Sequence, residues 1–290
     1  AGLGESAAKA GQNGRGGVDQ GAVEVKEDVR VAGHGKGCFG GNGRDYRLFV
    51  YICAPAQNLP HTMETTETAS PVDPRRFGGI ARLYGEAGRA RLAAARVCVV
   101  GIGGVGSWAA EALARSGVGH LTLIDLDHVA ESNINRQVHA IEPSIGQAKV
   151  QALKERIALI HPSCQVHTIE EFVDEDNAQA LLGAQPLDGL IDCCDQVRAK
   201  AVMAAWGQTN GVPVVAVGAA GGKVSPHLLE VADLADVTHD PLLASLRQRW
   251  RQRQGGARKG PMGLTCVFSR EAVRPPQDGV CDTDGSLNCH

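Results

Sequence analysis

Aromatic residues are scarce in this sequence, and neither sign of charge is in large excess. Phenylalanine, tryptophan and tyrosine make up 4% of the 290 residues, which disfavours a stacking platform for single-stranded nucleic acid. There are 29 lysines and arginines against 32 aspartates and glutamates, a net charge of −3. The chain is therefore no bulk polycation, and any binding of nucleic acid must come from a local patch.

Long apolar runs, a secretory signal and paired cysteine motifs are missing as well. No run of about eighteen apolar residues occurs, so nothing is predicted to span a membrane, and no basic head followed by an apolar stretch marks a signal peptide. The nine cysteines are odd in number and include no C-x-x-C spacing. This argues against a disulfide framework and against a zinc site, so we expect a protein of the reducing cytoplasm.

Composition divides the chain into three parts. Residues 1–70 are rich in glycine and polar residues without a sustained period, which indicates a disordered or non-native leader. Within it, only residues 46–53 are typical of a short strand. Residues 71–276 are predicted to form the folded domain, and residues 277–290 a short polar tail.

The predicted domain alternates between strand-like and helix-like segments. Short apolar runs predict strands, and apolar residues three or four apart predict helices; Trp108, Ala112 and Leu113 would share one helix face. The alternation indicates an α/β fold, a Rossmann-like, mainly parallel sheet with helices on both faces and ligand sites at the carboxyl ends of its strands. We expect strands at 97–100, 121–124, 165–169, 187–191 and 212–217, and helices at 107–115, 150–160 and 197–209.

A glycine-rich turn follows the first predicted strand and opens a helix. Its glycines, Gly101, Gly103, Gly104 and Gly106, would let backbone N–H groups approach a phosphate, which the positive end of the helix dipole also favours. Asp125 ends the next predicted strand, where a carboxylate can bind ribose hydroxyls. The pattern predicts nucleotide binding; the alternative is a turn that only packs a helix on the sheet.

Charged side chains near the ends of the other strands favour ATP over NAD. Arg136 and Lys149 are predicted to hold the β- and γ-phosphates, and Asp195 to hold Mg²⁺. A dehydrogenase needs no such set. Taken singly, Lys149 could be solvated at a helix start, and Asp195 could be a helix N-cap. We expect all three to converge on one polyphosphate, as catalytic residues.

Together these motifs resemble the adenylate-forming superfamily of ubiquitin-activating-enzyme-like proteins of the ThiF and MoeB type. Within it, the chain is most similar to the tRNA threonylcarbamoyladenosine dehydratases, and the missing C-x-x-C pairs fit this branch. The shared patterns are G-x-G-G-x-G at 101–106, D-x-D at 125–127, S-N-x-x-R-Q at 132–137, G-x-x-K at 146–149 and D-x-x-D at 192–195. The stretches that carry the dehydratase similarity are 76–85, 99–114, 218–222 and 266–269.

The resemblance implies an ATP-binding adenylating-type domain at 71–276. Such an enzyme would use ATP and Mg²⁺, without zinc, to activate the threonine carboxylate of a threonylcarbamoylated tRNA adenosine, which then cyclises with net loss of water. Asp125 would bind the ribose, and Asp127, Asn133 and Gln137 the nucleotide or its phosphates. The resemblance also implies a homodimer.

Three alternatives to this reaction stay open on the sequence. The first is an adenylyltransferase for a small ubiquitin-like or sulfur-carrier protein, which would then be a carrier or sulfur-transfer partner. The second is an NAD-dependent oxidoreductase, favoured only by the glycine turn and Asp125. The third is a nucleotide-sensing module without turnover, against which the intact Arg136, Lys149 and Asp195 argue.

One position departs from the superfamily pattern. In the adenylyltransferases a second arginine, three residues after the first, reaches the nucleotide of a neighbouring subunit, and Gly79 stands at that position here. Arg76 or Arg82 would have to supply a cation that acts in trans.

A basic run near the C-terminus is the candidate contact with tRNA. Phosphate contacts of this kind supply affinity without reading sequence. The first four arginines alternate every second residue, which would distribute them around a helix, so a solvated helix face is the alternative. The residues of this run are Arg247, Arg249, Arg251, Arg253, Arg258 and Lys259.

Cysteines and histidines near the predicted site receive mainly structural interpretations. Cys193 and Cys194 lie beside the predicted site, and Cys266 lies in a later apolar stretch. For all three, a packing role is favoured over a catalytic thiol. His227 and His239 are predicted to be surface or hydrogen-bonded polar residues.

Overall fold

The computed structural model describes residues 75–253 and 260–275. The predictions for the leader, for the strand at 46–53, for Arg258 and Lys259, and for the tail lie outside these residues.

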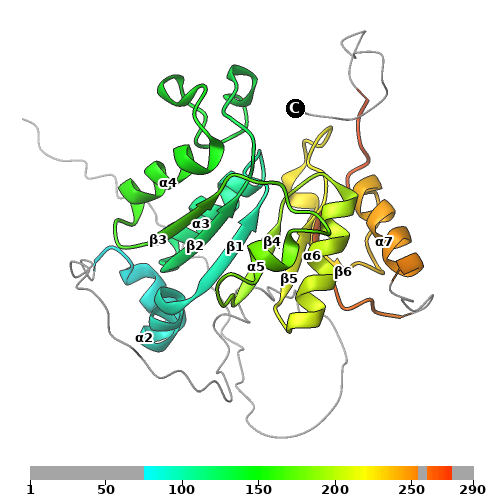
Figure 1. The fold of residues 1–290 in the computed structure, drawn as a ribbon, viewed down its shortest axis with the longest axis horizontal. Helices are drawn as coiled ribbons and strands as arrows, with labels where there is room; N and C mark the ends of the chain where they lie inside the picture. Colours follow the sequence, from blue (N-terminus) through cyan, green and yellow to red (C-terminus); the bar gives the residue numbers. More distant parts are fainter. Residues whose placement is uncertain (1–74, 254–259, 276–290) are drawn as a thin grey trace, which may run out of the picture. The chain divides into compact units, whose positions relative to one another are not determined.

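A seven-stranded sheet in the order β3-β2-β1-β4-β5-β7-β6 forms the centre of the fold (Figure 1). All neighbouring strands are parallel except β6, which runs antiparallel to β7. The predicted α/β class with a mainly parallel sheet is confirmed, although β6 and β7 were not predicted. The strands are β1 (Arg96–Val100), β2 (His120–Ile124), β3 (Gln165–Ile169), β4 (Gly189–Asp192), β5 (Val214–Val217), β6 (Leu229–Asp233) and β7 (Thr265–Ser269).

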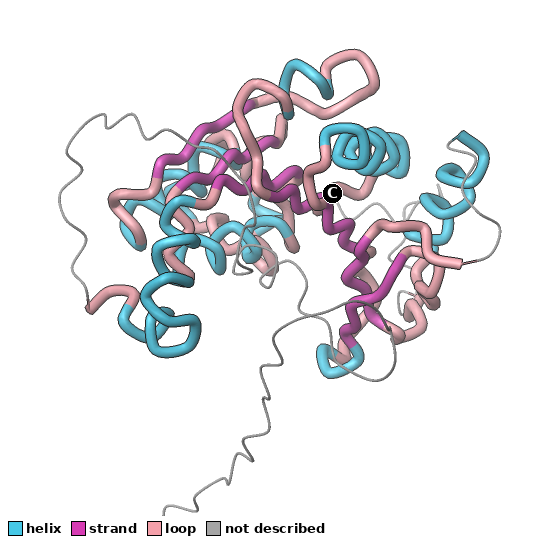
Figure 2. The backbone as a smooth tube through the Cα atoms, turned by 90° about the horizontal axis from the view of Figure 1, so that it is seen from below, coloured by secondary structure: helices cyan, strands magenta, loops and turns pink. Residues whose placement is uncertain are grey.

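Helices cover both faces of the sheet (Figure 2). The helices are α2 (Gly78–Ala94), α3 (Gly106–Arg115), α4 (Lys149–Ile160), α5 (Ala178–Leu182), α6 (Val197–Asn210) and α7 (Pro241–Arg253), with single 3₁₀ turns η1 (Glu131–Asn133), η2 (Glu142–Ser144) and η3 (Pro226–Leu228). Side chains alternate between the two faces along each strand. In β1, Val97 and Val99 belong to the core cluster that contains residues of α2, α3 and α4, whereas Cys98 and Val100 belong to the cluster that contains residues of α5, α6 and α7.

The face of α3 that meets the sheet differs from the predicted one. Leu113 is buried as expected, but Ala112 is exposed and Trp108 is 55% exposed. The small Ala110 and Ala114 occupy the buried face instead, because they let the helix lie close to β1. The prediction that Trp108 and Ala112 pack with Leu113 is therefore wrong.

The site is positioned by a reversal in strand order. The chain builds β1, β2 and β3 outward in one direction and then crosses to β4 on the other side of β1. In open α/β sheets, ligands bind at such a switch point, outside the carboxyl ends of the strands. Here that edge carries the turns that begin at Gly101, Asp125 and Cys193.

Candidate functional site

The glycine turn after β1 is closely packed at two of its glycines. Gly101 has φ +85°, and a Cβ added there would lie 2.8 Å from the backbone nitrogen of Cys194. A Cβ on Gly106 would lie 1.8 Å from the carbonyl oxygen of Gly101. At Gly103, by contrast, no atom lies within 4 Å of that position. The turn is thus closed on its protein side and open at Gly103, as a phosphate cradle requires.

Asp125 ties the end of β2 to this turn. Its Oδ2 accepts a hydrogen bond from the backbone N–H of Ile102 at 2.5 Å, and its Oδ1 accepts one from the N–H of Asp127 at 2.8 Å. Burial raises the pKa of Asp125 above its usual value, although both hydrogen bonds oppose this. Each carboxylate oxygen keeps a further lone pair, so the group can also accept hydrogen bonds from hydroxyls.

Lys149 is held beside Asp125 by a second aspartate. Its buried Nζ lies 2.7 Å from Oδ2 of Asp127, whose side chain is 54% exposed. The N–H of Lys149 also donates to the carbonyl of Asp127 at 3.0 Å. The ammonium at the start of α4 is therefore paired with Asp127, which follows by two residues the Asp125 carboxylate that anchors the glycine turn.

Arg136 contacts the glycine turn directly. Its Cγ lies 3.4 Å from where a Cβ on Gly104 would be. Its Nη1 donates to the carbonyl of Ser132 at 2.8 Å and to Oδ1 of Asn135 at 3.0 Å. The preceding 3₁₀ turn is closed by the buried Asn133, whose Oδ1 accepts a hydrogen bond from the N–H of Ala130 at 3.0 Å.

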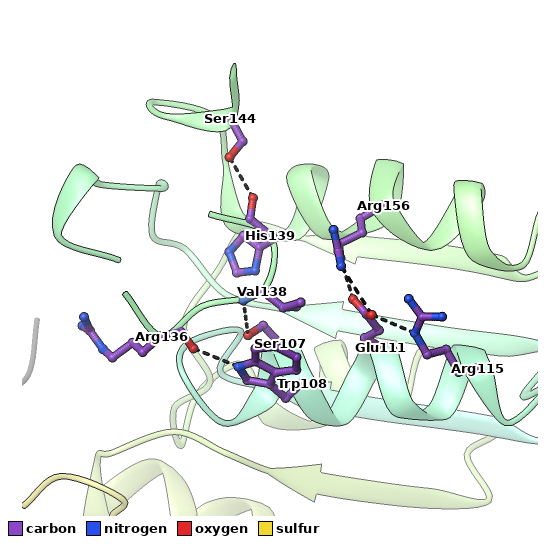
Figure 3. Close-up of polar contacts among 9 residues, drawn as sticks. All are labelled: Ser107, Trp108, Glu111, Arg115, Arg136, Val138, His139, Ser144 and Arg156. Carbon is purple, nitrogen blue, oxygen red and sulfur yellow. Dashed lines mark hydrogen bonds and ion pairs between the residues drawn. The ribbon is translucent and has the colours of Figure 1, made fainter. Parts of the chain in front are cut away.

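The first turn of α3 holds the segment that carries Arg136 (Figure 3). The indole Nε1 of Trp108 donates to the carbonyl of Arg136 at 2.9 Å, and the N–H of Val138 donates to Oγ of Ser107 at 3.3 Å. Since α3 begins within the glycine turn, the same element positions both the turn and the guanidinium that lies against it.

Buried side-chain atoms of two residues just after Arg136 have no hydrogen-bond partner in the described part of the chain. They are Oε1 of Gln137 and both ring nitrogens of His139. Burial first, and then the charges of Lys149 and Arg156, lower the pKa of His139 to about 4. The imidazole is neutral at pH 7. His139 was not singled out from the sequence, which carries no local signal for it.

The turn after β4 carries Asp195 and is organised by a buried ion pair. The Nζ of Lys200 lies 3.1 Å from Oδ1 of Asp192, and both side chains are fully buried. The same Oδ1 accepts a hydrogen bond from the N–H of Cys194 at 3.2 Å. Asp195 follows in an exposed position. Sequence reasoning missed Lys200, whose place in an apolar stretch of α6 was the available signal.

The donor set fits a magnesium ion only together with phosphate oxygens. Among residues 75–253 and 260–275, no group of three or more histidine, cysteine or acidic side chains could hold a metal ion. Asp127 is paired with Lys149, which leaves Asp195 as a single exposed carboxylate on its turn. Mg²⁺ is commonly held by one or two carboxylates and substrate phosphates, so this arrangement is compatible with a phosphate-dependent site.

The three cysteines discussed above are unsuited to act as nucleophiles. Burial raises the pKa of Cys193 and of Cys266 to about 12, and it raises that of Cys194 well above its usual value. The thiolate is the nucleophilic form, so these thiols are inert at neutral pH and fill space between the strands and helices.

Arg76 and Arg82 lie away from this glycine turn. Nη1 of Arg76 donates to the carbonyl of Ile160, the last residue of α4, and Nε of Arg82 donates to the carbonyl of Gly78 at 3.3 Å. Helix α4 has its other end at Lys149, roughly 17 Å away at 1.5 Å per residue. Neither arginine belongs to the nucleotide edge of its own chain.

The arginines of α7 divide between two faces of the helix. Nη1 of Arg247 donates to the carbonyls of Leu234 and Val237 at 3.3 and 2.7 Å. Arg249 and Arg253 both pair with Glu175 on the other side of the helix. The arginines are thus distributed around α7, as their spacing indicated.

The segments that carry the glycine turn, Arg136, Lys149 and Asp195 come together at one edge of the sheet. Arg136 lies against Gly104, and the turn that leads to Asp195 packs on Gly101 through Cys194. Lys149 joins through Asp127, whose neighbour Asp125 binds the turn at Ile102. Four segments that are distant in sequence therefore form one site beside β1 and β4.

This fold and site define a ThiF-type nucleotide-binding protein, and the chain belongs to the ThiF family, whose model matches residues 78–268. It is 48% identical over 211 residues to the tRNA threonylcarbamoyladenosine dehydratase of Escherichia coli, covering 71% of this chain and 78% of that protein. The enzyme of the same name from Haemophilus influenzae is 42% identical over 219 residues, covering 74% and 83%. A crystal structure of the Escherichia coli enzyme in complex with ATP matches with a TM-score of 0.68 at 47% identity, covering 70% of this chain and 84% of that one.

No helix in the described ranges is long and apolar enough to cross a membrane.

Proposed function

We propose that this protein catalyses the ATP-dependent dehydration of N6-threonylcarbamoyladenosine in tRNA to its cyclic form. The observation that carries the proposal is that Arg136 and the turn before Asp195 pack on the glycine turn, while Lys149 pairs with Asp127 beside the Asp125 carboxylate that bonds to it. Its 48% identity to a dehydratase of that name supports the substrate.

The charged residues supply what activation of a carboxylate requires. A carboxylate is a poor electrophile and hydroxide a poor leaving group, so the threonine carboxylate must first be joined to AMP or to phosphate. Backbone N–H groups at residues 101–106 and the start of α3 would bind phosphate oxygens. Arg136 and Lys149 would stabilise the charge that develops on the phosphates during transfer.

The remaining polar residues orient the nucleotide. Asp125 would accept hydrogen bonds from ribose hydroxyls with its free lone pairs, while Asp127, Asn133 and Gln137 would position the nucleotide or its phosphates. Asp195 would hold Mg²⁺, which neutralises phosphate charge when bound. Binding of a phosphate by Lys149 requires an exchange of partner, because the phosphate would compete with Asp127 for the Lys149 ammonium.

Ring closure needs no protein nucleophile. An atom of the substrate's own threonylcarbamoyl group attacks the activated carbonyl carbon, one ring bond forms, and the bond to the phosphate oxygen breaks. AMP or phosphate leaves with the carboxylate oxygen, and the attacking group loses a proton. The nucleoside has then lost one water, and the raised thiol pKa values of Cys193 and Cys194 agree with a route that avoids a thioester.

The proposed reaction also implies contacts with tRNA and with a second subunit. The arginines of α7 are the proposed contact with the tRNA backbone. Arg76 and Arg82, which lie away from their own glycine turn, would act only on the nucleotide of a second subunit in a homodimer. A cytoplasmic location is consistent with a tRNA substrate.

Purified protein incubated with ATP, Mg²⁺ and threonylcarbamoylated tRNA tests the reaction. Mass spectrometry of the digested nucleosides should show loss of one water that depends on ATP. Absence of this product, together with ATP–diphosphate exchange that requires a carrier protein ending in Gly-Gly, would establish the adenylyltransferase alternative instead.

A further inference from the structure

Trp108 is unusual among the tryptophans of this chain. The three are Trp108, Trp206 and Trp250; the last two are 9% and 4% exposed, whereas Trp108 is 55% exposed. A large aromatic ring left in water forgoes the free energy of its burial. An exposed indole beside a ligand site therefore calls for a functional explanation.

The indole is fixed in orientation, and its polar group is already used. Its Nε1 donates to the carbonyl of Arg136 at 2.9 Å, as Figure 3 shows. The indole N–H is a donor and is the only polar atom of the side chain. What remains available to a ligand is an apolar ring, which binds another flat ring rather than a phosphate or a hydroxyl.

The position of this ring relative to the glycine turn separates it from the ribose-binding side. Asp125 meets the turn at Ile102, whereas Arg136, which holds the Trp108 indole, meets it at Gly104. With the ribose at Asp125 and the terminal phosphates at Arg136, as proposed above, the adenine of ATP would lie on the side of the turn away from Arg136. The ring beside Arg136 is free for a second base.

We propose that Trp108 stacks on a base of the substrate RNA next to the adenosine that is modified. This inference rests on the proposed function and adds to it a recognition subsite for an unpaired nucleotide of the tRNA. Proteins read RNA loops by stacking unpaired bases on aromatic side chains. One such contact changes affinity about 5- to 150-fold by alanine substitution.

The experiment compares W108A with W108F. Both variants lose the N–H that binds Arg136, so any displacement of the guanidinium is common to the two, and only W108F keeps a ring. The probe is a synthetic RNA stem-loop that carries threonylcarbamoyladenosine among its unpaired loop nucleotides. We expect its Kd for W108A to exceed that for W108F about 5- to 150-fold, with equal Kd values for ATP.

Intrinsic fluorescence gives a second readout in the wild-type protein. Trp206 and Trp250 are buried, so quenching by the stem-loop would report on Trp108 and should vanish in W108F. Equal stem-loop affinities in the two variants would overturn the inference. So would quenching by ATP alone, which assigns the ring to adenine, or emission that shifts with protein concentration alone, which assigns it to a second copy of this chain.

Failure of this inference and failure of the proposed function give different results. If W108A dehydrates the tRNA with wild-type kcat/KM, the stacking subsite is wrong and the function stands. If the stem-loop binds and quenches as expected but no water is lost, the reaction is wrong and the RNA subsite stands.

Discussion

Lys200 and Asp192 form an ion pair inside the protein, with Nζ 3.1 Å from Oδ1 and neither side chain exposed. Burial acts to lower the pKa of Lys200, but the charge of Asp192 and the hydrogen bond to it outweigh burial and raise the pKa above its usual value, so the lysine stays charged. Desolvation of two charges offsets most of their attraction. The effect that remains is geometric: the pair fixes the turn from β4 to Asp195.

We therefore expect K200M to destabilise the protein and a second change to compensate. K200M leaves the Asp192 carboxylate buried without its partner, which costs about 3–5 kcal/mol. D192N in the K200M background removes that charge and should restore most of the loss. Unfolding in denaturant measures both variants, and wild-type stability of K200M would contradict the assignment of a compensating pair.

Two glycines of the phosphate turn should respond differently to alanine. In G106A the new methyl group meets the Gly101 carbonyl at 1.8 Å, so the turn must shift and the melting temperature should fall. In G103A it meets no protein atom within 4 Å, so stability should be retained while ATP binding weakens. Thermal unfolding with and without ATP separates the two effects, and equal behaviour of the variants would argue against a phosphate at Gly103.

Removing the charge of Lys149 should abolish most turnover without unfolding the protein. K149M keeps the buried stem and leaves only the exposed Asp127 unpaired, so the cost in stability is small. Loss of one charge-stabilising group typically lowers kcat about 10²–10³-fold, and we expect the same of D195N. The matched control is K154M on the exposed side of α4. Retained kcat in K149M or D195N would remove that residue from the site.

His139 should make the protein less stable in mild acid. Its pKa is about 4 in the folded chain against about 6.5 when unfolded, so protons bind preferentially to the unfolded state. Stability is full above pH 6.5 and declines as the pH falls toward 4, by at most about 1.4 kcal/mol per pH unit. In H139L the decline of stability with falling pH should be less steep. Part of the pH dependence that H139L retains comes from His161, whose pKa is also lowered. The same slope of stability against pH in H139L and the wild-type protein would contradict the prediction.

Glu175 restrains two of the arginines proposed to contact tRNA. It pairs with both Arg249 and Arg253 at the surface, where such pairs add little stability. E175Q should therefore tighten tRNA binding, and R253Q should weaken it and reduce the salt dependence by roughly one phosphate contact. Binding titrations at several salt concentrations test this prediction. Equal tRNA affinities of the wild-type protein and both variants would show that the RNA does not contact this face of α7.

The sequence predicts the inner strands well because their signal is local. Buried parallel strands are continuous apolar runs, as at Val97–Val100 in β1. Strand β5 begins at Val214, two residues later than predicted and directly after Pro213, which lacks the N–H of a central strand position. Strands β6 and β7 were missed because Leu229–Asp233 is half exposed at the sheet edge and its partner is found only across a long connection.

Some residues of the site can likewise be predicted from local sequence, whereas others depend on how distant segments pack. Gly101 to Gly106 and Asp125 follow from spacing along the chain, which fixes a turn and a strand end. The burial of Lys200 depends on which side of α6 packs on the sheet. The exposure of Trp108 depends in the same way on which side of α3 packs on the sheet. Periodicity alone did not predict the orientation of α3, because its small alanines permit either face of the helix to lie inward.

The strand order has a consequence for biosynthesis. The nucleotide edge joins β1 and β2 to the turn after β4, so a nascent chain on the ribosome lacks part of the pocket until residue 195 has emerged. Nucleotide then recognises only a chain in which β1, β2 and the turn after β4 are in place, and at a hundred times its Kd it would add about 2.7 kcal/mol to the folded state. Cellular ATP would in this way act as a late co-translational ligand that secures the newly made protein against unfolding.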